Sequence, residues 1–298
     1  MWRKLAWRSC NFLGRVISVV PFIGLPVKGK TLRHRLSGFA KRFFCVTMRN
    51  PMSAYGHIIY WDTASYFYPM EYATESYEPD TVSLFKSLIH PGWTVVDLGA
   101  HIGFYSLLSA SLVGGGGKVY AFEPVQANYT LLLKNIEANG YVRVIKPVRK
   151  AVADRSGHVS LFMGERDKSE SSMYRVPWVS AQSISVETTS LDNFFEGEGW
   201  PSVKVIKMDI EGAEKAALEG MRQLVARNLS LKLIMEFSPG TQVGAGVSPD
   251  ELFSILTEIG FTKFFAIRSS LEPLNIPQDI PHLVQMAGGG YVNLLCEK

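Results

Sequence analysis

The sequence predicts an α/β fold in which a mostly parallel sheet is covered by helices on both faces. From about residue 80 onward, short apolar runs that indicate strands alternate with amphipathic stretches that indicate helices. The run at 94–98 is largely apolar, which is typical of a parallel strand buried on both faces. With 47% hydrophobic and 19% charged residues, the 298-residue chain has the composition of a globular protein with a large core.

The first half of this alternation contains three strands and three helices. Pro91-Gly92 ends the first helix, and Gly140 ends the third. The run of four glycines at 114–117 is a flexible turn that lacks the Gly-Lys-Ser/Thr ending of a phosphate-binding loop. The expected strands are 94–98, 118–123 and 141–146, and the expected helices are 81–90, 102–113 and 126–139.

The second half continues the pattern after an irregular stretch. Residues 150–162 alternate and turn, which predicts a short hairpin, and 164–182 are polar and Ser-rich, which predicts a loop. Ser248 and Glu251 form a capping box with Pro249 at the first helical position. The expected strands are 203–210, 231–237, 261–268 and 289–298, and the expected helices are 211–228 and 249–260.

The N-terminal part of the chain is strongly basic. Residues 1–61 contain eleven Lys or Arg and no acid, whereas the remainder carries 20 basic and 27 acidic residues. We therefore expect a basic, helical N-terminal arm at 1–70 and a separate domain at 71–298. Residues 1–30 combine Trp, aliphatic and basic side chains, which suits peripheral contact with an anionic membrane. Packing on the main domain and a cleaved signal peptide are the alternatives. The apolar run at 16–27 is too short to span a bilayer.

Cysteine and histidine usage favours a reducing compartment and no metal site. Cys10, Cys45 and Cys296 are far apart and form no CxxC pair, and the six histidines show no metal-binding spacing. The expected location is the cytoplasm, with association at the inner face of the membrane through the arm.

Acidic residues stand at the ends of the central predicted strands. Asp97, Glu123 and Asp209 each end a strand, and Glu236 lies near the end of another. In a parallel sheet, these ends meet at the edge where ligands bind. A buried carboxylate without a partner is costly, so several together indicate a ligand with several donors.

The turn after Asp97 suggests which ligand this is. A dinucleotide fold has G-x-G-x-x-G, but here D-x-G-A-H-x-G begins with an acid, which repels a pyrophosphate and attracts an ammonium group. This pattern argues against a nicotinamide oxidoreductase. Glu123 is placed to accept two hydrogen bonds from a ribose. A ligand with a ribose and an amino-acid ammonium is S-adenosylmethionine.

The sequence also resembles the FkbM-type family of class I S-adenosylmethionine-dependent methyltransferases. The resemblance implies a Rossmann-like class I methyltransferase fold with a mostly parallel seven-stranded sheet, and it covers about residues 70–240. His101 stands where the family often has Asn. The pieces that carry the resemblance, in the family's order, are YEP (77–79), HPGWTVVDLGAHIGFYS, VYAFEPVQANYTLLLKNIEANG, AVADRSG, TTSLDNF, IKMDIEGAE and LIMEF.

The expected cofactor site combines the acids with the glycine turn. Asp97 is expected at the cofactor's ammonium group and Glu123 at its ribose. The backbone of Gly99, Ala100 and His101 lines the site, and Gly103 allows close helix packing. The resemblance implies that Asp154 meets the adenine amino group. Alternatives are a helix-capping Asp97, a solvated Glu123 and a simple turn at Asp154.

The expected reaction is methyl transfer to a hydroxyl group. Asp209 is the candidate general base, with Glu211 or Glu236 orienting the acceptor. Glu214 begins a helix, where an acid is favoured by the dipole in any case. His101 and His158 are weaker candidates for the base. Two or three of these carboxylates could instead hold a divalent cation.

The acceptor is expected to be a small molecule or glycan, such as a hydroxyl of a carbohydrate, a lipid-linked sugar or another natural product. A nucleic-acid methyltransferase is the second hypothesis, with the arm as a phosphate anchor, but the acids of DIEGAE oppose a phosphate backbone. A non-catalytic protein that binds only the cofactor or a membrane is the third.

Overall fold

The computed structural model describes residues 50–62, 68–164, 171–175 and 179–298. Residues 1–49 of the expected arm at 1–70 lie outside these residues, and with them the stretch 1–30 for which membrane contact is expected. In the part described, no helix is long and apolar enough to cross a membrane.

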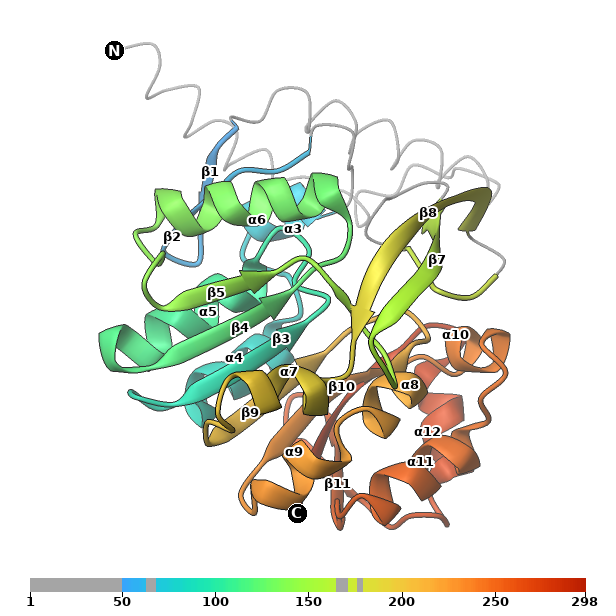
Figure 1. Cartoon of the computed structure of the whole chain (residues 1–298). Coiled ribbons are helices and arrows are strands. Elements are labelled where there is room, and N and C mark those ends of the chain that lie inside the picture. Colours follow the sequence, from blue (N-terminus) through green and yellow to red (C-terminus); the bar gives the residue numbers. More distant parts are fainter. Residues whose placement is uncertain (1–49, 63–67, 165–170, 176–178) are drawn as a thin grey trace, which may run out of the picture.

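The main sheet has eight strands in the order β12-β11-β13-β10-β9-β3-β4-β5 (Figure 1). Seven strands were expected. The additional one is β12, which forms an antiparallel pair with β11 at the sheet edge. The strands are β3 (Thr94–Leu98), β4 (Lys118–Phe122), β5 (Ile145–Val148), β9 (Val203–Met208), β10 (Lys232–Phe237), β11 (Lys263–Ile267), β12 (Leu271–Leu274) and β13 (Val292–Glu297).

The centre of this sheet is parallel, as predicted. β5, β4, β3, β9 and β10 run in one direction, and β13 is antiparallel to both β10 and β11. Asp97 of β3 lies opposite Lys207 of β9 in the register. The carboxyl ends of the parallel strands therefore meet at one edge, where the acidic residues were predicted to lie.

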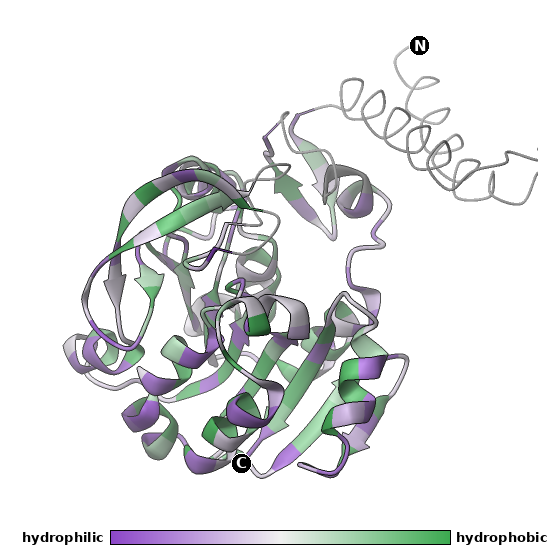
Figure 2. Ribbon diagram, turned by 90° about the vertical axis from the view of Figure 1, so that its right-hand side faces the viewer, coloured by the Kyte–Doolittle hydropathy of each residue, from purple (hydrophilic) through white to green (hydrophobic). Residues whose placement is uncertain are grey.

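Helices cover both faces of the sheet (Figure 1). One face packs against α4 (Pro79–Leu88), α5 (Phe104–Val113) and α6 (Gln126–Ala138), and its core includes Val95 of β3 and Val205 of β9. The other face carries Val96 and Ile206 and packs against α7 (Leu191–Gly197), α8 (Glu214–Glu219), α9 (Arg222–Arg227), α11 (Pro249–Glu258) and α12 (Ile280–Ala287). Strand residues thus alternate between two cores. The strands of the sheet are accordingly mostly hydrophobic in Figure 2.

Two predicted helix boundaries depend on specific local contacts. The capping box is confirmed, because Oγ of Ser248 accepts the backbone N–H of Glu251 at 3.2 Å and α11 begins at Pro249. The expected helix at 211–228 is divided into α8 and α9 at Gly220. A Cβ atom there would lie 2.1 Å from the carbonyl oxygen of Ala153.

A separate three-stranded sheet follows β5. It has the order β6-β8-β7, with β6 (Ala151–Val152), β7 (Gly157–Gly164) and β8 (Val179–Thr189). The hairpin expected at 150–162 is wrong, because β6 and β7 each pair with β8 rather than with each other. The expected loop at 164–182 ends earlier than predicted, because β8 begins at residue 179 and pairs with β7.

The residues before α4 also pack on the main body. β1 (Met52–Ala54) and β2 (His57–Ile59) form a hairpin, followed by α3 (Tyr68–Ala73). Asn135 of α6 accepts the backbone N–H of Tyr60 at 2.6 Å and donates to the Ile102 carbonyl at 2.7 Å. Trp61 is buried in the same core as α5. The division into an arm and a domain stays a prediction, but 50–62 contribute to this core.

Candidate functional site

A row of polar side chains crosses the carboxyl end of the parallel sheet on the α5 face. Asp97 on β3, Lys207 on β9 and Glu236 on β10 each lie two residues beyond an apolar residue of the core on the α5 side, so their side chains project from the same face. The side chain of Lys207 is only 1% exposed, although it is a lysine near the end of a mostly apolar strand. Two pockets open beside this row, and we name them the Glu123 pocket and the Lys207 pocket.

Asp97 is buried between β3 and α5. The hydroxyl of Ser106 on α5 donates to its Oδ2 at 2.6 Å. Burial raises the pKa of Asp97 to about 6, against the opposing effects of the Ser106 hydrogen bond and the charge of Lys207. Asp97 lines the Lys207 pocket, so at neutral pH it presents a carboxylate to a ligand there.

The turn after β3 depends on two glycines. Gly99 has φ +81°, and a Cβ atom there would lie 1.8 Å from the backbone oxygen of Asp209. Gly103 has φ +99°, and its Cβ would lie 2.7 Å from Cδ1 of Leu132. His101 also takes a left-handed conformation, with φ +51°. The turn therefore brings the ends of β3 and β9 closer than any side chain at position 99 would permit.

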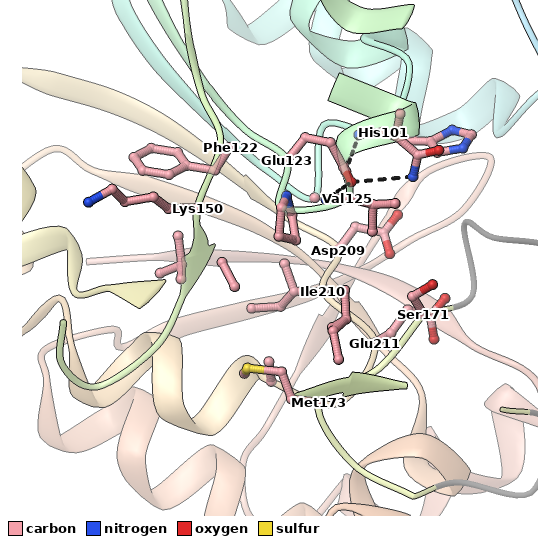
Figure 3. Close-up of a pocket in the computed structure, with 17 residues that line it drawn as sticks. His101, Phe122, Glu123, Val125, Lys150, Ser171, Met173, Asp209, Ile210 and Glu211 are labelled. Atoms are coloured by element: carbon pink, nitrogen blue, oxygen red, sulfur yellow. Dashed lines mark hydrogen bonds between the residues drawn. The ribbon is translucent and has the colours of Figure 1, made fainter. Parts of the chain in front are cut away.

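Glu123 directly follows β4, and its carboxylate connects the loops after β3 and β4 by hydrogen bonds (Figure 3). Its Oε2 accepts the backbone N–H of His101 at 2.9 Å, and its Oε1 accepts the Val125 N–H at 2.9 Å and Nδ2 of Asn128 at 3.3 Å. Burial raises the pKa of Glu123 to about 7, although these three donors favour the ionised form. A carboxylate has about four acceptor positions, so one remains for a ligand hydroxyl.

The Glu123 pocket encloses about 580 Å³, including its part open to solvent. Its walls come from the residues after β3, β4 and β9, from β6, and from the small sheet and the segment 171–175. Figure 3 shows Phe122, Glu123 and Met173 around it. Ala151 and Val152 add an apolar surface. A planar base and a ribose match this mixture of apolar walls and a hydrogen-bonding carboxylate.

The Lys207 pocket lies on the α5 side of the same strand ends and encloses about 510 Å³. Four aromatic side chains line it together with Asp97 and Lys207: Tyr72, Tyr77, Phe104 and Tyr105. The ring of Tyr72 stacks on that of Phe104, with centroids 4.9 Å apart. The two pockets share the residues Gly99, His101, Asp209 and Glu211, so they meet at the ends of β3 and β9.

Asp209 stands where the two pockets meet. Its side chain is 27% exposed, and Nζ of Lys207 lies 3.4 Å from its Oδ2. Burial alone would lower the pKa of Lys207, but the carboxylates around it, led by Asp209, raise it above its ordinary value. Lys207 is therefore a fixed positive charge beside Asp209.

Glu78 and Tyr105 complete this charged cluster, and the sequence reasoning assigned neither of them a role. Glu78 precedes α4 in a left-handed conformation, with φ +38°. It accepts hydrogen bonds from the hydroxyls of Tyr105 and Tyr291. In the sequence, this cluster is signalled by Lys207 near the end of a mostly apolar strand and by Glu78 in the YEP motif. Only the fold shows that these two residues lie close together.

Glu236 lies deep in the cluster. Burial, together with repulsion from Asp209 and Glu211, raises its pKa well above its ordinary value. One oxygen each from Glu78, Asp209 and Glu236 lies within 4.8 Å of the others. This spacing would suit a cation, but Lys207 already supplies a positive charge at Asp209. A metal site stays an alternative expectation without further support.

The remaining predicted residues lie in different surroundings. Glu211 lines both pockets with φ +51°, and its carbonyl oxygen accepts the Ser172 hydroxyl at 2.6 Å. Ala100 is buried and lines the Lys207 pocket. The exposed Asp154 lies 3.8 Å from Nε of Arg155 and is absent from the lining of both pockets as far as the described residues define them. Its adenine contact stays a prediction.

These features fit S-adenosylmethionine. Because Gly99 has no Cβ atom, the backbone can approach the junction of the pockets. Glu123 has one acceptor position left for a ligand hydroxyl. Asp97 offers a buried carboxylate that suits an ammonium group. The ligand's apolar, hydroxyl and cationic parts each find a matching surface.

The chain matches a family model and resembles a known methyltransferase. The model of the methyltransferase FkbM domain matches residues 97–263. The hexuronic acid methyltransferase AglP of Haloferax volcanii is 25% identical over 183 residues, which are 61% of this chain and 68% of that protein.

Solved structures also match, at low sequence identity. A putative rRNA methylase from Clostridium thermocellum is 12% identical with a TM-score of 0.46, covering 74% of this chain and 94% of its own. An FkbM methyltransferase from Methylobacillus flagellatus is 15% identical with a TM-score of 0.42, covering 76% of this chain and 52% of its own. The family model covers more than half of the chain. The chain therefore belongs to the FkbM methyltransferase family, and it is an S-adenosylmethionine-dependent methyltransferase of the Rossmann-like class I fold.

Proposed function

We propose that the protein methylates a hydroxyl group of a carbohydrate. S-adenosylmethionine spans the Glu123 pocket and the junction and reaches Asp97 in the wall of the Lys207 pocket, and the acceptor occupies the aromatic part of that pocket. The observation that carries this proposal is the lining of the Lys207 pocket. Aromatic rings line it together with carboxylates and a lysine. Aromatic faces suit the C–H surface of a sugar ring, and carboxylates accept hydrogen bonds from its hydroxyls. The name of the AglP relative, a hexuronic acid methyltransferase, supports the same class of acceptor.

We assign the cofactor contacts by position. Asp97 binds the ammonium group, and the backbone of Gly99, Ala100 and His101 lines the methionine part. Glu123 accepts a ribose hydroxyl with its remaining acceptor position. Gly103 keeps α5 close to α6. Asp154 is placed at the adenine side by resemblance alone.

Bound S-adenosylmethionine supplies an electrophilic methyl carbon. Asp209 lies at the junction of the two pockets and accepts the proton of the acceptor hydroxyl as the oxygen–carbon bond forms. Nζ of Lys207, 3.4 Å from Oδ2 of Asp209, helps to hold that carboxylate in position. Glu211, which lines the Lys207 pocket, orients the acceptor. Glu236 is outside the described lining of that pocket and would act on the acceptor only through its proximity to Asp209. The aromatic wall excludes water from the reacting oxygen.

The charge of the Lys207 pocket favours a glycan over a nucleic acid. Asp97, Asp209 and Glu211 line it, opposed by the one cation that its described lining contains, Lys207. A phosphate backbone would be repelled there. A neutral small-molecule or glycan acceptor, including a neutral sugar carried on a lipid at a membrane, meets no such barrier.

The test has two steps. First, calorimetric titration with S-adenosylmethionine should show binding by the wild type and its loss in Asp97→Ala. Second, transfer of a labelled methyl group should be measured to neutral glycosides, uronic acid glycosides and lipid-linked sugars, with total RNA as the comparison. Label on a sugar oxygen is the expected result. Binding of the cofactor with label appearing only on RNA would overturn the proposal.

A further inference from the structure

Glu214 is a buried acid that the proposed chemistry does not use. It begins α8, five residues after Asp209, and its side chain is 3% exposed. Its Oε1 accepts the backbone N–H of Gly212 at 3.1 Å. Gly212 has φ +95° and belongs to the loop that carries Asp209 and Glu211. One oxygen of Glu214 thus holds the catalytic loop, whereas Oε2 is buried without a hydrogen-bond donor among the described residues.

The side chain that interacts with Glu214 is that of Gln242. It lies in α10 (Pro239–Gly244), which follows β10, and is 1% exposed. Its Nε2 donates to the backbone oxygen of Glu236 at 3.4 Å. Its Oε1 is buried, and within the described part of the chain it too lacks a donor. The side chains of Glu214 and Gln242 interact directly. Each of these two interacting side chains therefore has one buried oxygen that lacks a donor within the described part of the chain.

The two possible orientations of the Gln242 amide can be compared by counting hydrogen bonds. If the amide were turned over, Nε2 would donate to an ionised Glu214, but Oε1 would then face the Glu236 carbonyl, and two acceptors would repel each other. In the observed orientation, Nε2 satisfies the Glu236 carbonyl. A proton on Oε2 of Glu214 then satisfies Oε1 of Gln242. Only the second arrangement leaves no buried polar atom of this group without a partner.

The surroundings favour the protonated acid. Burial raises the pKa of Glu214 to about 7, with the charge of Asp209 acting in the same direction against the opposing effects of the backbone N–H groups of Glu214 and Gly212 and of the Gln242 side chain. From the segment 171–175, Tyr174 faces Glu214 as a neutral phenol, since burial raises its pKa. The adjacent Lys215 points to Glu251 on α11, with Nζ 2.6 Å from its Oε1, so it does not neutralise Glu214.

We propose that Glu214 carries a proton in the folded enzyme and donates it to Oε1 of Gln242, which makes Glu214 a positioning residue for the catalytic loop. Its two oxygens connect the Gly212 amide to Gln242, and Gln242 connects to the end of β10 at Glu236. The bridge therefore fixes Asp209 relative to Glu236. This inference rests on the proposed function for the roles of Asp209 and Glu236, but the protonation itself does not.

The bridge has a defined pH dependence. Because the pKa of this acid is raised on folding, the folded protein binds the proton more tightly than the unfolded chain. The stabilising contribution is therefore complete at low pH and is lost as the pH rises from the ordinary value of 4.5 through about 7. Glutamine at this position would keep both hydrogen bonds at every pH, because its amide can accept from Gly212 and donate to Gln242.

The experiment compares thermal unfolding of the wild type and Glu214→Gln from about pH 5 to pH 9. The wild type should lose roughly 5 to 10 °C more than the variant over this range. Glu219→Gln, at the other end of α8, is the matched control and should follow the wild type. Parallel curves for the wild type and Glu214→Gln would overturn the proposal.

A second measurement works even if the variant folds less well. The infrared difference spectrum, wild type minus Glu214→Gln at pH 6, should contain the carbonyl band of a protonated carboxylic acid. Its replacement by a carboxylate band would show that Glu214 is ionised and would refute the bridge. Neither readout requires an acceptor, so a failure here is distinct from a failure to find a methylated sugar.

Discussion

The Nζ atom of Lys207 lies 3.4 Å from Oδ2 of Asp209, in the interior of a parallel sheet. A lysine that is 1% exposed survives there only because carboxylates surround it. The pair links the proposed base to the core of the fold, so stability and catalysis depend on the same contact.

Replacing Lys207 by Met should therefore reduce both the stability of the fold and catalysis. The substitution leaves Asp209, Glu78 and Glu236 without their positive partner, which costs on the order of 3–5 kcal/mol for a broken buried ion pair. Denaturant unfolding measures the loss in free energy. Lys204→Met, near the start of the same strand, is the control and should change little, because Lys204 is only half-buried and its Nζ lies 3.3 Å from Oγ of Ser230. Equal stability of the two variants would contradict a structural role for the pair.

The affinity for S-adenosylmethionine should fall as the pH drops below about 6. The pKa of Asp97 is raised to about 6 by burial, so protonation removes the charge that attracts the ammonium group. Affinity should then decrease by up to about tenfold per pH unit. Calorimetric titration between pH 5 and pH 8 measures it. Asp97→Asn should bind weakly at every pH; a variant with the wild-type pH profile would remove Asp97 from the ammonium site.

Gly99→Ala should disrupt the junction of the pockets. Its Cβ would lie 1.8 Å from the Asp209 backbone oxygen, so the ends of β3 and β9 would have to separate. Gly140→Ala is the matched control, because φ is also positive (+72°) but no atom lies within 4 Å of the added Cβ. The control should lose only about 1–2 kcal/mol of stability, from the left-handed conformation alone. Cofactor titration and thermal unfolding of both variants check the difference.

Tyr77→Leu should weaken acceptor binding without affecting the cofactor. Tyr77 lines the Lys207 pocket but not the Glu123 pocket. Loss of an aromatic face costs about 0.5–1.5 kcal/mol, or up to roughly tenfold in KM for a sugar acceptor. Tyr129→Leu, on α6 away from the lining of both pockets, is the control. A raised dissociation constant for S-adenosylmethionine in Tyr77→Leu would instead place the cofactor against the aromatic part of this pocket.

The sequence predicted the strands and the edge that bears the site, because both are encoded locally. β3 has the predicted bounds, and Asp97, Glu123 and Asp209 meet at the predicted edge. The partners of these acids were not predictable in the same way. Lys207 meets Glu78 only because residues 129 positions apart are brought together by the pairing of β9 and the packing of α4.

The irregular stretch after β5 was predicted least well. A hairpin at 150–162 satisfies the local pattern, but β7 finds a better partner in the eleven-residue β8. Pairing between distant segments leaves no periodic signal in either one. The same holds for β1 and β2, which are three residues each and too short to show alternation.

The Glu123 pocket is built from two sheets: the main sheet supplies Glu123, and the small sheet supplies Ala151 and Leu161. A ligand that fills it binds only when both sheets are folded. Its binding free energy must then appear as added protection of the small sheet against hydrogen exchange, even at amides far from the ligand. Hydrogen exchange in β7 and β8, with and without S-adenosylmethionine, would therefore report cofactor occupancy before any acceptor is known.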